Sequence, residues 1–530
     1  MALSLGIIVG FQVLFPQQNP QPVATEAGSA PIAGDPAAAV AGQPDAPAAT
    51  ASAAAVSAPA QAELPPGPIV EVSGPLFRAR VVSRGGRLAG FALTEYQKDP
   101  APGAGPYDLV RDQGAGPLAL LWRNEAGAVV DDRSVLYEVT TSAAEARPGQ
   151  PAVITMKGVT STGATITKIL QLPADSYRLD FQVATQGLPA TPLAVGWSRG
   201  QHAHKAQADV EGPVGYFDGK LHSFDASTMT ETEVVEGLAS WAGYAEHYFL
   251  TAIVPAGRER LKLVASVGDG AGQATVWTEG PATTLRYGLF LGPKSFGELE
   301  KAGGDLTQAV DLGWFWFVAK PLLLALRMIH GLVGNYGWAI ILLTAAIRLA
   351  FYPVNKKQID AMKGMQRIQP EVKKLQERHK DDREKLNAEM MELYRRHKVN
   401  PLAGCLPMLI QLPVFIGLYN VLLQSIELRH APFFGWMLDL SQPDRLGTLA
   451  IPFVEPAGIP VMTLLMGASM LLQQKMTPST ADPSQQKVMM IMPVVFTVMF
   501  VNFPAGLVLY WLSNNVLSIA QQALSDRNGK

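Results

Sequence analysis

The chain has 530 residues, of which 48% are hydrophobic and 17% charged, and its formal net charge is -2. A near-neutral chain gives no reason to expect a nucleic-acid substrate, and the single cysteine, Cys405, excludes an intramolecular disulfide framework and a cysteine-based metal cluster. Up to about residue 300 the sequence is polar and Gly-rich, and after it come long apolar runs of Met, Leu and Phe. This length and this change in composition predict at least two domains.

The first residues predict an anchor and a tether. Residues 1–15 are apolar apart from Gln12 but short for a spanning helix, which needs about 17 to 25 residues. We interpret them as an uncleaved transmembrane anchor, with a signal-peptide core as the alternative. Residues 16–68 are almost entirely Ala, Pro, Gln, Gly and Ser, so we expect a disordered linker.

Residues 69–300 predict a large β-sandwich. Short alternating runs are separated by Gly, Pro and Asp clusters, and they cover 77–82, 177–183, 248–254, 261–265 and 274–278. His202 and His204 would point to opposite faces of a strand, and Asp209, Glu211 and Asp218 lack the spacing of a calcium loop. With no nucleophile motif and no phosphate loop, we predict no catalytic residue, no metal site and no cofactor.

A membrane-interface helix is expected over 312–330. Four consecutive aromatic residues, 314–317, precede Lys320 and Pro321, a pattern typical of a helix that lies in the interface. The alternative is that this segment begins one long spanning helix, but Pro321 favours a break.

The segment over 336–353 is an apolar, membrane-length stretch that contains Arg348. A cation at mid-bilayer costs roughly 2.5 to 3.5 kcal/mol even on lenient insertion scales, so Arg348 is a functional candidate. Thr344 and Tyr352 lie four residues to either side of it and would give it a polar strip on the same helical face. The alternative is that Arg348 snorkels to the nearer interface.

A charged segment, 355–400, predicts a hairpin of two amphipathic helices. Apolar residues repeat at helical spacing in two stripes: Met365, Ile368, Val372 and Leu375, then Leu386, Met390 and Leu393. Asp381, followed three residues later by Glu384, is expected to cap the second helix.

Four further membrane segments are expected over 403–426, 459–473, 488–503 and 506–523. The hairpin is dense in Lys and Arg whereas the connection 430–458 is poor in them, so the positive-inside rule places the hairpin in the cytoplasm. Both termini are then predicted to be cytoplasmic, with the β-domain and the 430–458 connection on the opposite side.

Polar residues recur inside these segments. Trp511, Asn514, Ser518 and Gln521 or Gln522 form one face of the last helix, and Gln411, Asn420, Gln424, Thr497 and Asn502 lie in the others. A single amide usually joins transmembrane helices. Together with an arginine that has no carboxylate nearby in the apolar cores, they predict a water-filled cavity in the membrane.

The second half, about 305–525, resembles the YidC family of membrane-protein insertases in its longer form from bacteria with two membranes. The resemblance is carried by Thr344-x-x-x-Arg348 with Tyr352-Pro353, Asn400-Pro401 to Pro407, Gln411-x-Pro413, Glu427-Leu-Arg429, Asp482-Pro-x-Gln-Gln-Lys487 and Phe503-Pro-Ala-Gly506 to Tyr510. The β-region is a looser match to the family's periplasmic supersandwich, through 241–249.

The resemblance implies a fold: five core transmembrane helices after the N-terminal anchor, a periplasmic β-sandwich and a cytoplasmic helical hairpin. It also implies a hydrophilic groove that carries Arg348, with Thr344, Gln411 and Trp511 at positions along the groove or the path of the substrate. The short C-terminus departs from members whose long basic tail is a proposed ribosome contact.

We therefore predict a multi-pass protein of the bacterial inner membrane that inserts and helps to fold other membrane proteins, and that is not an enzyme. By resemblance, its partners are nascent membrane proteins, the Sec translocon (SecYEG and SecDF), the ribosome, the signal recognition particle receptor and membrane lipids. The alternatives are a secondary transporter for a small anion and a carbohydrate enzyme built on the β-domain. Transporters often show repeated halves, which are not visible here.

Overall fold

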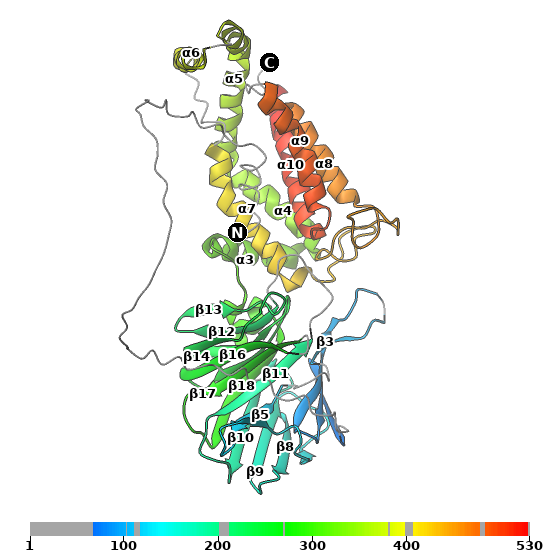
Figure 1. Ribbon diagram of the computed structural model, residues 1–530. Coiled ribbons are helices and arrows are strands. Elements are labelled where there is room, and N and C mark those ends of the chain that lie inside the picture. Colours follow the sequence, from blue (N-terminus) through cyan, green and yellow to red (C-terminus); the bar gives the residue numbers. More distant parts are fainter. Residues whose placement is uncertain are drawn as a thin grey trace, which may run out of the picture. The chain divides into compact units, whose positions relative to one another are not determined.

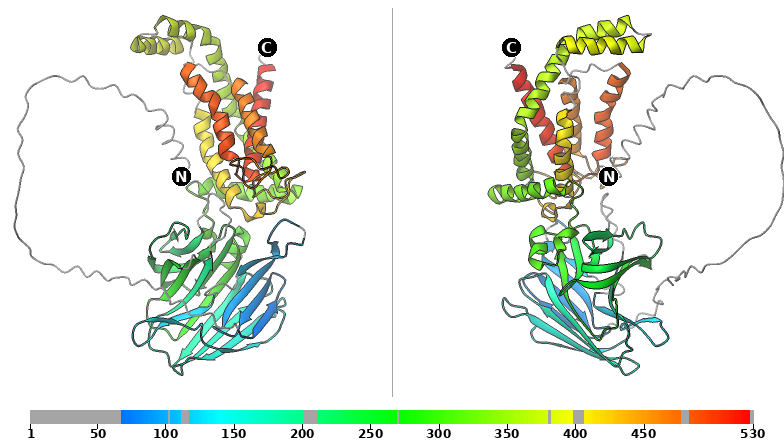
Figure 2. Two further views of the ribbon diagram at one scale, coloured as in Figure 1. Left: turned by 45° about the vertical axis from the view of Figure 1, so that its right-hand side comes forward. Right: turned by 90° about the vertical axis from the view of Figure 1, so that its left-hand side faces the viewer.

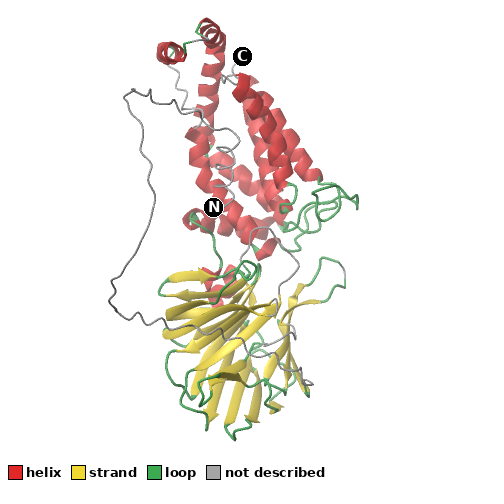
Figure 3. Cartoon of the chain, in the orientation of Figure 1, coloured by secondary structure: helices red, strands yellow, loops and turns green. Residues whose placement is uncertain are grey.

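The computed structural model describes residues 67–101, 103–110, 117–200, 211–268, 271–379, 382–397, 406–476 and 483–527. Strands make up the first part of this range and helices the second (Figure 3). The expected anchor, the expected linker up to residue 66, Cys405, His202, His204 and Asp209 lie outside the described residues.

Two antiparallel sheets form the β-domain. The smaller contains, in order, β1 (Ile69–Ser73), β2 (Phe77–Val82), β3 (Arg87–Gln97) and β4 (Pro106–Val110). The larger follows the order β6-β5-β11-β17-β16-β14-β15-β18-β10-β9-β8-β7, and β12 and β13 pair beside β14. Its strands are β5 (Ala119–Arg123), β6 (Val129–Asp131), β7 (Tyr137–Thr141), β8 (Ala152–Val159), β9 (Thr165–Leu172), β10 (Arg178–Gln186), β11 (Leu193–Gly200), β12 (Gly212–Phe217), β13 (Lys220–Ser223), β14 (Glu233–Ala245), β15 (Phe249–Pro255), β16 (Glu259–Gly268), β17 (Ala271–Thr278) and β18 (Thr284–Pro293).

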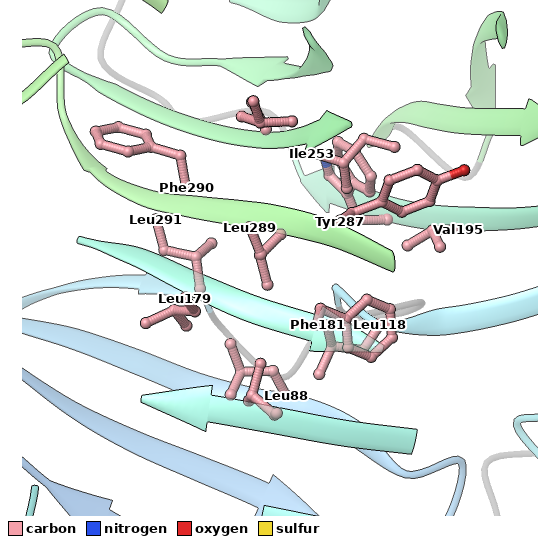
Figure 4. Close-up of a cluster of buried hydrophobic side chains, with 14 of the residues drawn as sticks. Leu88, Leu118, Leu179, Phe181, Val195, Ile253, Tyr287, Leu289, Phe290 and Leu291 are labelled. Carbon is pink, nitrogen blue, oxygen red and sulfur yellow. The ribbon is translucent and has the colours of Figure 1, made fainter. Parts of the chain in front are cut away.

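Alternating side chains fill the space between the sheets. In β9 and β10 every second residue is buried, the signature of a strand with one face on a core. Figure 4 shows Leu88 of β3 near Phe181 and Leu179 of β10, with Leu289 of β18 beyond them. Each of the five runs predicted as strands coincides with or overlaps β2, β10, β15, β16 or β17, so those predictions are confirmed.

Helices follow the β-domain. They are α2 (Phe296–Ala302), α3 (Trp316–Val333), α4 (Tyr336–Ala350), α5 (Tyr352–Arg378), α6 (Arg383–Arg396), α7 (Leu406–Gln424), α8 (Val461–Met476), α9 (Pro483–Phe500) and α10 (Ala505–Arg527), with 3₁₀ turns η1 (Leu306–Ala309) and η3 (Ile426–Leu428). One hydrophobic core joins α3, α4, α7, α8 and α10 (Figure 1). It contains Ala319, Ile340, Val421, Met466 and Val508.

The chain breaks between α3 and α4, which is between the two predicted segments 312–330 and 336–353, and not at Pro321. Helix α3 runs through Pro321 and ends where Gly334 adopts a φ of 67°. Asn335 then caps α4 by accepting a hydrogen bond from the Trp338 amide. Pro321 lies inside α3 and does not end it, so the expectation of a break at this residue was wrong.

Helix α3 buries one side only. Ala319, Leu323 and Leu326 are buried, while Trp316, Leu324 and Leu332 are exposed. In Figure 2 α3 lies across the direction of α9 and α10. The position of α3 in the membrane interface stays a prediction.

By length and hydropathy, one of the described helices, Trp316–Val333, is sufficient to cross a membrane alone. The pair Tyr336–Ala350 and Tyr352–Met365 is long and apolar enough to cross a membrane only when both helices are taken together, and it is bent by 63°. Gln411–Gln424 and Met490–Phe500 belong to the shorter apolar helices of 10–17 residues. At about 1.5 Å per residue such stretches reach at most about 25 Å, less than a hydrocarbon core of about 30 Å.

Helices α5 and α6 pack into a hairpin with its own small core. Ile368 and Val372 of α5 are buried against Leu393 and Tyr394 of α6, and Met365, Leu375 and Met390 pack around them. Leu386 is half-buried and lies outside this cluster, and Tyr394 belongs to it although the spacing did not single it out. The cap of α6 is Asp382, which accepts from the Lys385 amide at 3.0 Å, whereas we expected Asp381.

Candidate functional site in the helical core

The candidate site is built where α4 and α10 pack together. Ala339, Ile340 and Leu343 form the buried side of α4. Gly506 of α10 allows a close approach, because a Cβ there would lie 3.5 Å from the Ile340 side chain and 3.2 Å from the Leu440 oxygen. This packing fixes the rotation of α4 and turns Arg348, in its last turn, towards α10.

Arg348 is held by two residues one turn apart on α10. Its Nε donates to Asn514 Oδ1 at 2.9 Å, and its Nη2 donates to the Asn514 backbone oxygen at 3.2 Å and to Ser518 Oγ. Ser518 Oγ in turn donates to the Asn514 oxygen at 2.7 Å. Arg348, Asn514 and Ser518, three of the predicted groove residues, are therefore brought together.

The charge of Arg348 is not neutralised by this arrangement. Its partners are an amide, a backbone oxygen and a hydroxyl, and within the described part of the chain no carboxylate pairs with it. The side chain is half-buried, so part of it stays accessible from outside the helical core. The guanidinium is thus oriented by neutral groups and stays charged.

Thr344, Gln411 and Trp511, the other predicted groove residues, are not among the hydrogen-bond partners of Arg348 in the described part of the chain. Thr344 is 1% exposed, and its hydroxyl donates to the Ile340 oxygen of its own helix. Thr344 thus belongs to the packed side of α4 together with Ile340 and Leu343. Gln411 lies half-buried on α7.

Trp511 lies in an aromatic cluster. Its ring is 4.7 Å from that of Phe500 and 5.7 Å from that of Phe496, both on α9, and 5.0 Å from that of Phe415 on α7. Trp511 thus connects three helices one turn before Asn514. The sequence placed it on the polar face of α10 but gave no sign of these aromatic partners.

Several amides predicted to line a cavity join elements instead. Asn420 donates to the Leu312 oxygen at 2.9 Å, and Gln522 donates to the Met476 oxygen at 2.8 Å. Asn515, which sequence reasoning missed, donates to Ser469 Oγ of α8 at 3.0 Å. Asn515 and Gln522 thus follow the ordinary use of amides between helices, and Asn420 ties α7 to the segment before α3.

The described residues contain no group of three or more His, Cys, Asp or Glu side chains that could hold a metal ion. In the β-domain, Asp218 Oδ1 accepts from the Leu238 amide at 3.2 Å and so has a structural partner.

The similarity of this chain to known proteins identifies its family. The family model described as "YidC periplasmic domain" matches residues 69–325, and the one described as "60Kd inner membrane protein" matches residues 328–530. The membrane protein insertase YidC of Pelobacter propionicus is 40% identical over 98% of this chain and 96% of its own length. The chain belongs to the YidC family of membrane protein insertases.

Other YidC proteins agree with this assignment. The membrane protein insertase YidC of Syntrophobacter fumaroxidans is 37% identical over 86% of each chain. A solved structure of an active YidC insertase with its first transmembrane domain resolved is 19% identical and covers 86% of this chain and 94% of its own, with a TM-score of 0.37. Because this TM-score is low, the assignment to the family rests on the relatives that are similar in sequence.

Family membership settles three points of the sequence analysis. The protein is an inner-membrane insertase with a periplasmic domain, which here is the β-sandwich. The alternative of a secondary anion transporter is not supported, since these relatives carry the name of insertases. The same membership supports the prediction that the chain is not an enzyme.

Proposed function

We propose that Arg348 is the transient charge partner of substrate segments that this insertase carries across the membrane. The observation behind the proposal is a half-buried guanidinium that Asn514 and Ser518 orient without neutralising. A substrate carboxylate would find a fixed cation there, which lowers the cost of taking an acidic segment out of water.

The driving force comes from the apolar part of the substrate. Burial in lipid yields about 25 cal/mol per Å² of apolar surface, so one substrate helix outweighs the cost of moving a short polar tail. The described apolar helices of 10–17 residues would thin the barrier that this tail must cross. Gln411 and Trp511 would lie along the path of the substrate.

The hairpin of α5 and α6 is proposed to receive the substrate in the cytoplasm. Its apolar residues pack against each other, so its outer faces carry the charges, among them Lys373, Lys374 and Arg395, all of which are exposed. Such a surface suits the ribosome, the signal recognition particle receptor or anionic lipid headgroups. We also propose that the protein works alone or with the Sec translocon (SecYEG and SecDF) and that it acts as a chaperone for its substrates. Both of its termini would lie in the cytoplasm.

The test uses a single-spanning substrate with an acidic periplasmic tail and a matched substrate in which the tail Asp residues are Asn. Arg348→Ala is expected to lower insertion of the acidic substrate about tenfold and that of the neutral one far less, since a hydrogen bond to a charged group is worth about 1.5 to 3 kcal/mol. Equal losses for both substrates would contradict a role in charge pairing.

Photocrosslinking tests the path. Photoreactive residues at Gln411 and Trp511 are expected to react with a stalled, ribosome-bound substrate. The control position is Leu332 at the end of α3, which is 87% exposed and lies just before the start of α4, whereas Arg348 lies in the last turn of α4. Crosslinks from Leu332 alone would contradict the proposed path.

A further inference from the structure

The connection between η3 and α8 contains a loop, 445–459, whose base is tied by the hydrogen bonds of one arginine. Arg445 uses its Nε and both Nη atoms. It donates to the oxygens of Pro456 at 2.7 Å, Asp444 at 2.7 Å, Glu455 at 2.8 Å and Val501 at 3.0 Å, and to Asn502 Oδ1 at 2.8 Å. These five bonds use all the donors of a guanidinium, so Arg445 is a structural tie and not a free cation.

Asn502, between α9 and α10, fixes the tip of the loop. Its Oδ1 also accepts from the Glu455 amide at 3.1 Å, and its Nδ2 donates to the Phe453 oxygen at 3.0 Å. Hydrogen bonds between Leu446 and Ile459, at 2.9 and 3.0 Å, close the base into a short ladder. The loop is therefore attached to the same end of the bundle from which α8 begins.

The tip presents apolar side chains outwards. Phe453 is 88% exposed and has a φ of 65°, a backbone conformation that is unfavourable for a phenylalanine and persists only when its surroundings impose it. Leu449 and Leu446 are also exposed, at 59% and 42%. A fold that spends hydrogen bonds to hold a strained phenylalanine away from its own core points to a partner outside the chain.

We infer that this loop is an anchor that inserts Phe453 into the outer-leaflet interface of the membrane. Three observations select lipid as the partner. Figure 1 shows the loop beside the ends of α8 and α10, reaching outwards from the bundle. Its exposed leucines continue an apolar surface that α8 begins with Leu464 and Leu465, each 52% exposed. Glu455 is the one acidic side chain between 446 and 460, where Lys and Arg are lacking, and aromatic residues favour this depth.

The anchor has a mechanical consequence. Arg445 and Asn502 connect it to the turn between α9 and α10, and α10 carries Asn514 and Ser518. Inserting the tip would hold this end of α10 at a fixed depth. This inference rests on the proposed function only in that α8 and α10 lie in the membrane, and the role of Arg348 could fail without affecting it.

Spin labels test the inference on the full chain in lipid nanodiscs. Cys405 is the single cysteine, so Cys405→Ser gives a clean background for Phe453→Cys. Glu125→Cys in an exposed β-domain turn is the reference for water, and Leu465→Cys on α8 is the reference for lipid. The label at 453 is expected to collide more with oxygen than with a water-soluble nickel complex, as the label at 465 does.

Each other outcome overturns a defined part. A water-exposed label at 453 together with a lipid-exposed label at 465 would show that the loop is not a membrane anchor. Water-exposed labels at both positions would show that α8 does not lie in the membrane. Dipolar coupling between labels at 453 would assign the loop to a contact between two copies. Asn502→Ala is expected to increase the mobility of the label at 453, and an unchanged spectrum would show that Asn502 does not fix the tip.

Discussion

Arg348 of α4 and Asn514 of α10 are joined by two hydrogen bonds, from Nε to Oδ1 at 2.9 Å and from Nη2 to the backbone oxygen at 3.2 Å. A flexible arginine is thereby held in one orientation by a neutral neighbour. The effect of the arginine on a substrate should depend on this neighbour.

We expect Asn514→Leu to reduce insertion of a substrate with an acidic tail about tenfold, because one charge-assisted hydrogen bond that orients the guanidinium is lost. The measurement is insertion into proteoliposomes with acidic and neutral tails. Asn515→Leu is the matched control, since Asn515 binds Ser469 and not Arg348. It should affect both tails equally, and the same behaviour for Asn514→Leu would refute the orienting role.

Helices α8 and α9 approach closely at Gly467. A Cβ at this position would lie 2.1 Å from Thr497 Oγ1, so Gly467→Ala forces the helices apart or Thr497 to another rotamer. We expect a loss of about 1 to 3 kcal/mol, seen as a lower Tm in detergent. Thr497→Ala removes the clashing atom, so the double variant should lose less than the sum of the single losses. Strict additivity would show that the contact is relaxed in the protein.

A fully buried ion pair connects β9 with the residue that follows β6, both in the larger sheet, and its lysine also bonds to the turn between β2 and β3 of the smaller sheet. Lys168 Nζ of β9 lies 2.5 Å from Asp132 Oδ2 and donates to the oxygens of Gly85, Gly86 and Leu118. Burial lowers the pKa of Lys168 and raises that of Asp132, and the attraction between the two charges opposes both shifts.

Lys168→Met should therefore destabilise the protein by about 3 to 5 kcal/mol, because Asp132 is left buried without its cation. Lys262→Met, which removes an exposed pair with Glu236, should cost no more than about 1 kcal/mol. Urea unfolding of the full chain, followed by the circular dichroism of the sheets, compares the two. Similar losses would mean that Asp132 becomes protonated at little cost.

The stability of the protein should fall in acid through His247. Its Nε2 donates to the Leu423 oxygen at 3.1 Å, and burial lowers its pKa to about 3, with the charge of Lys294 adding to the shift. In the unfolded chain the imidazole binds a proton once the pH falls below its ordinary pKa of 6.5. In the folded chain it stays neutral until the pH approaches its lowered pKa of about 3. The contribution of His247 to the free energy of unfolding is therefore complete above pH 6.5 and is lost as the pH falls towards 3.

At pH 5 the expected loss from this group is about 2 kcal/mol relative to neutral pH. His247→Gln cannot take up the proton, so its unfolding free energy should depend less on pH over this range than that of the unmodified protein. Thermal unfolding at several pH values gives the comparison. Parallel pH profiles would show that His247 titrates normally in the folded chain.

Local patterns in the sequence were sufficient to predict individual strands and helices. Alternation predicted β2 and β10, and apolar spacing at 365–375 predicted the side of α5 that packs on α6. An arginine in an apolar segment marked Arg348 before any partner was known. These features follow from the fixed periods of strands and helices and from the cost of burying charge, which depend on residues that are close in sequence.

Only the tertiary structure decided which residues meet. Asn514 and Ser518 reach Arg348 across more than 160 positions, while Thr344, one turn from Arg348, is buried. Lys168 with Asp132, and Arg445 with Asn502, left no periodic signal at all. The rotation of a helix about its axis and the crossing of distant segments depend on packing across the whole core, and a period of 3.6 or 2 residues does not encode that packing.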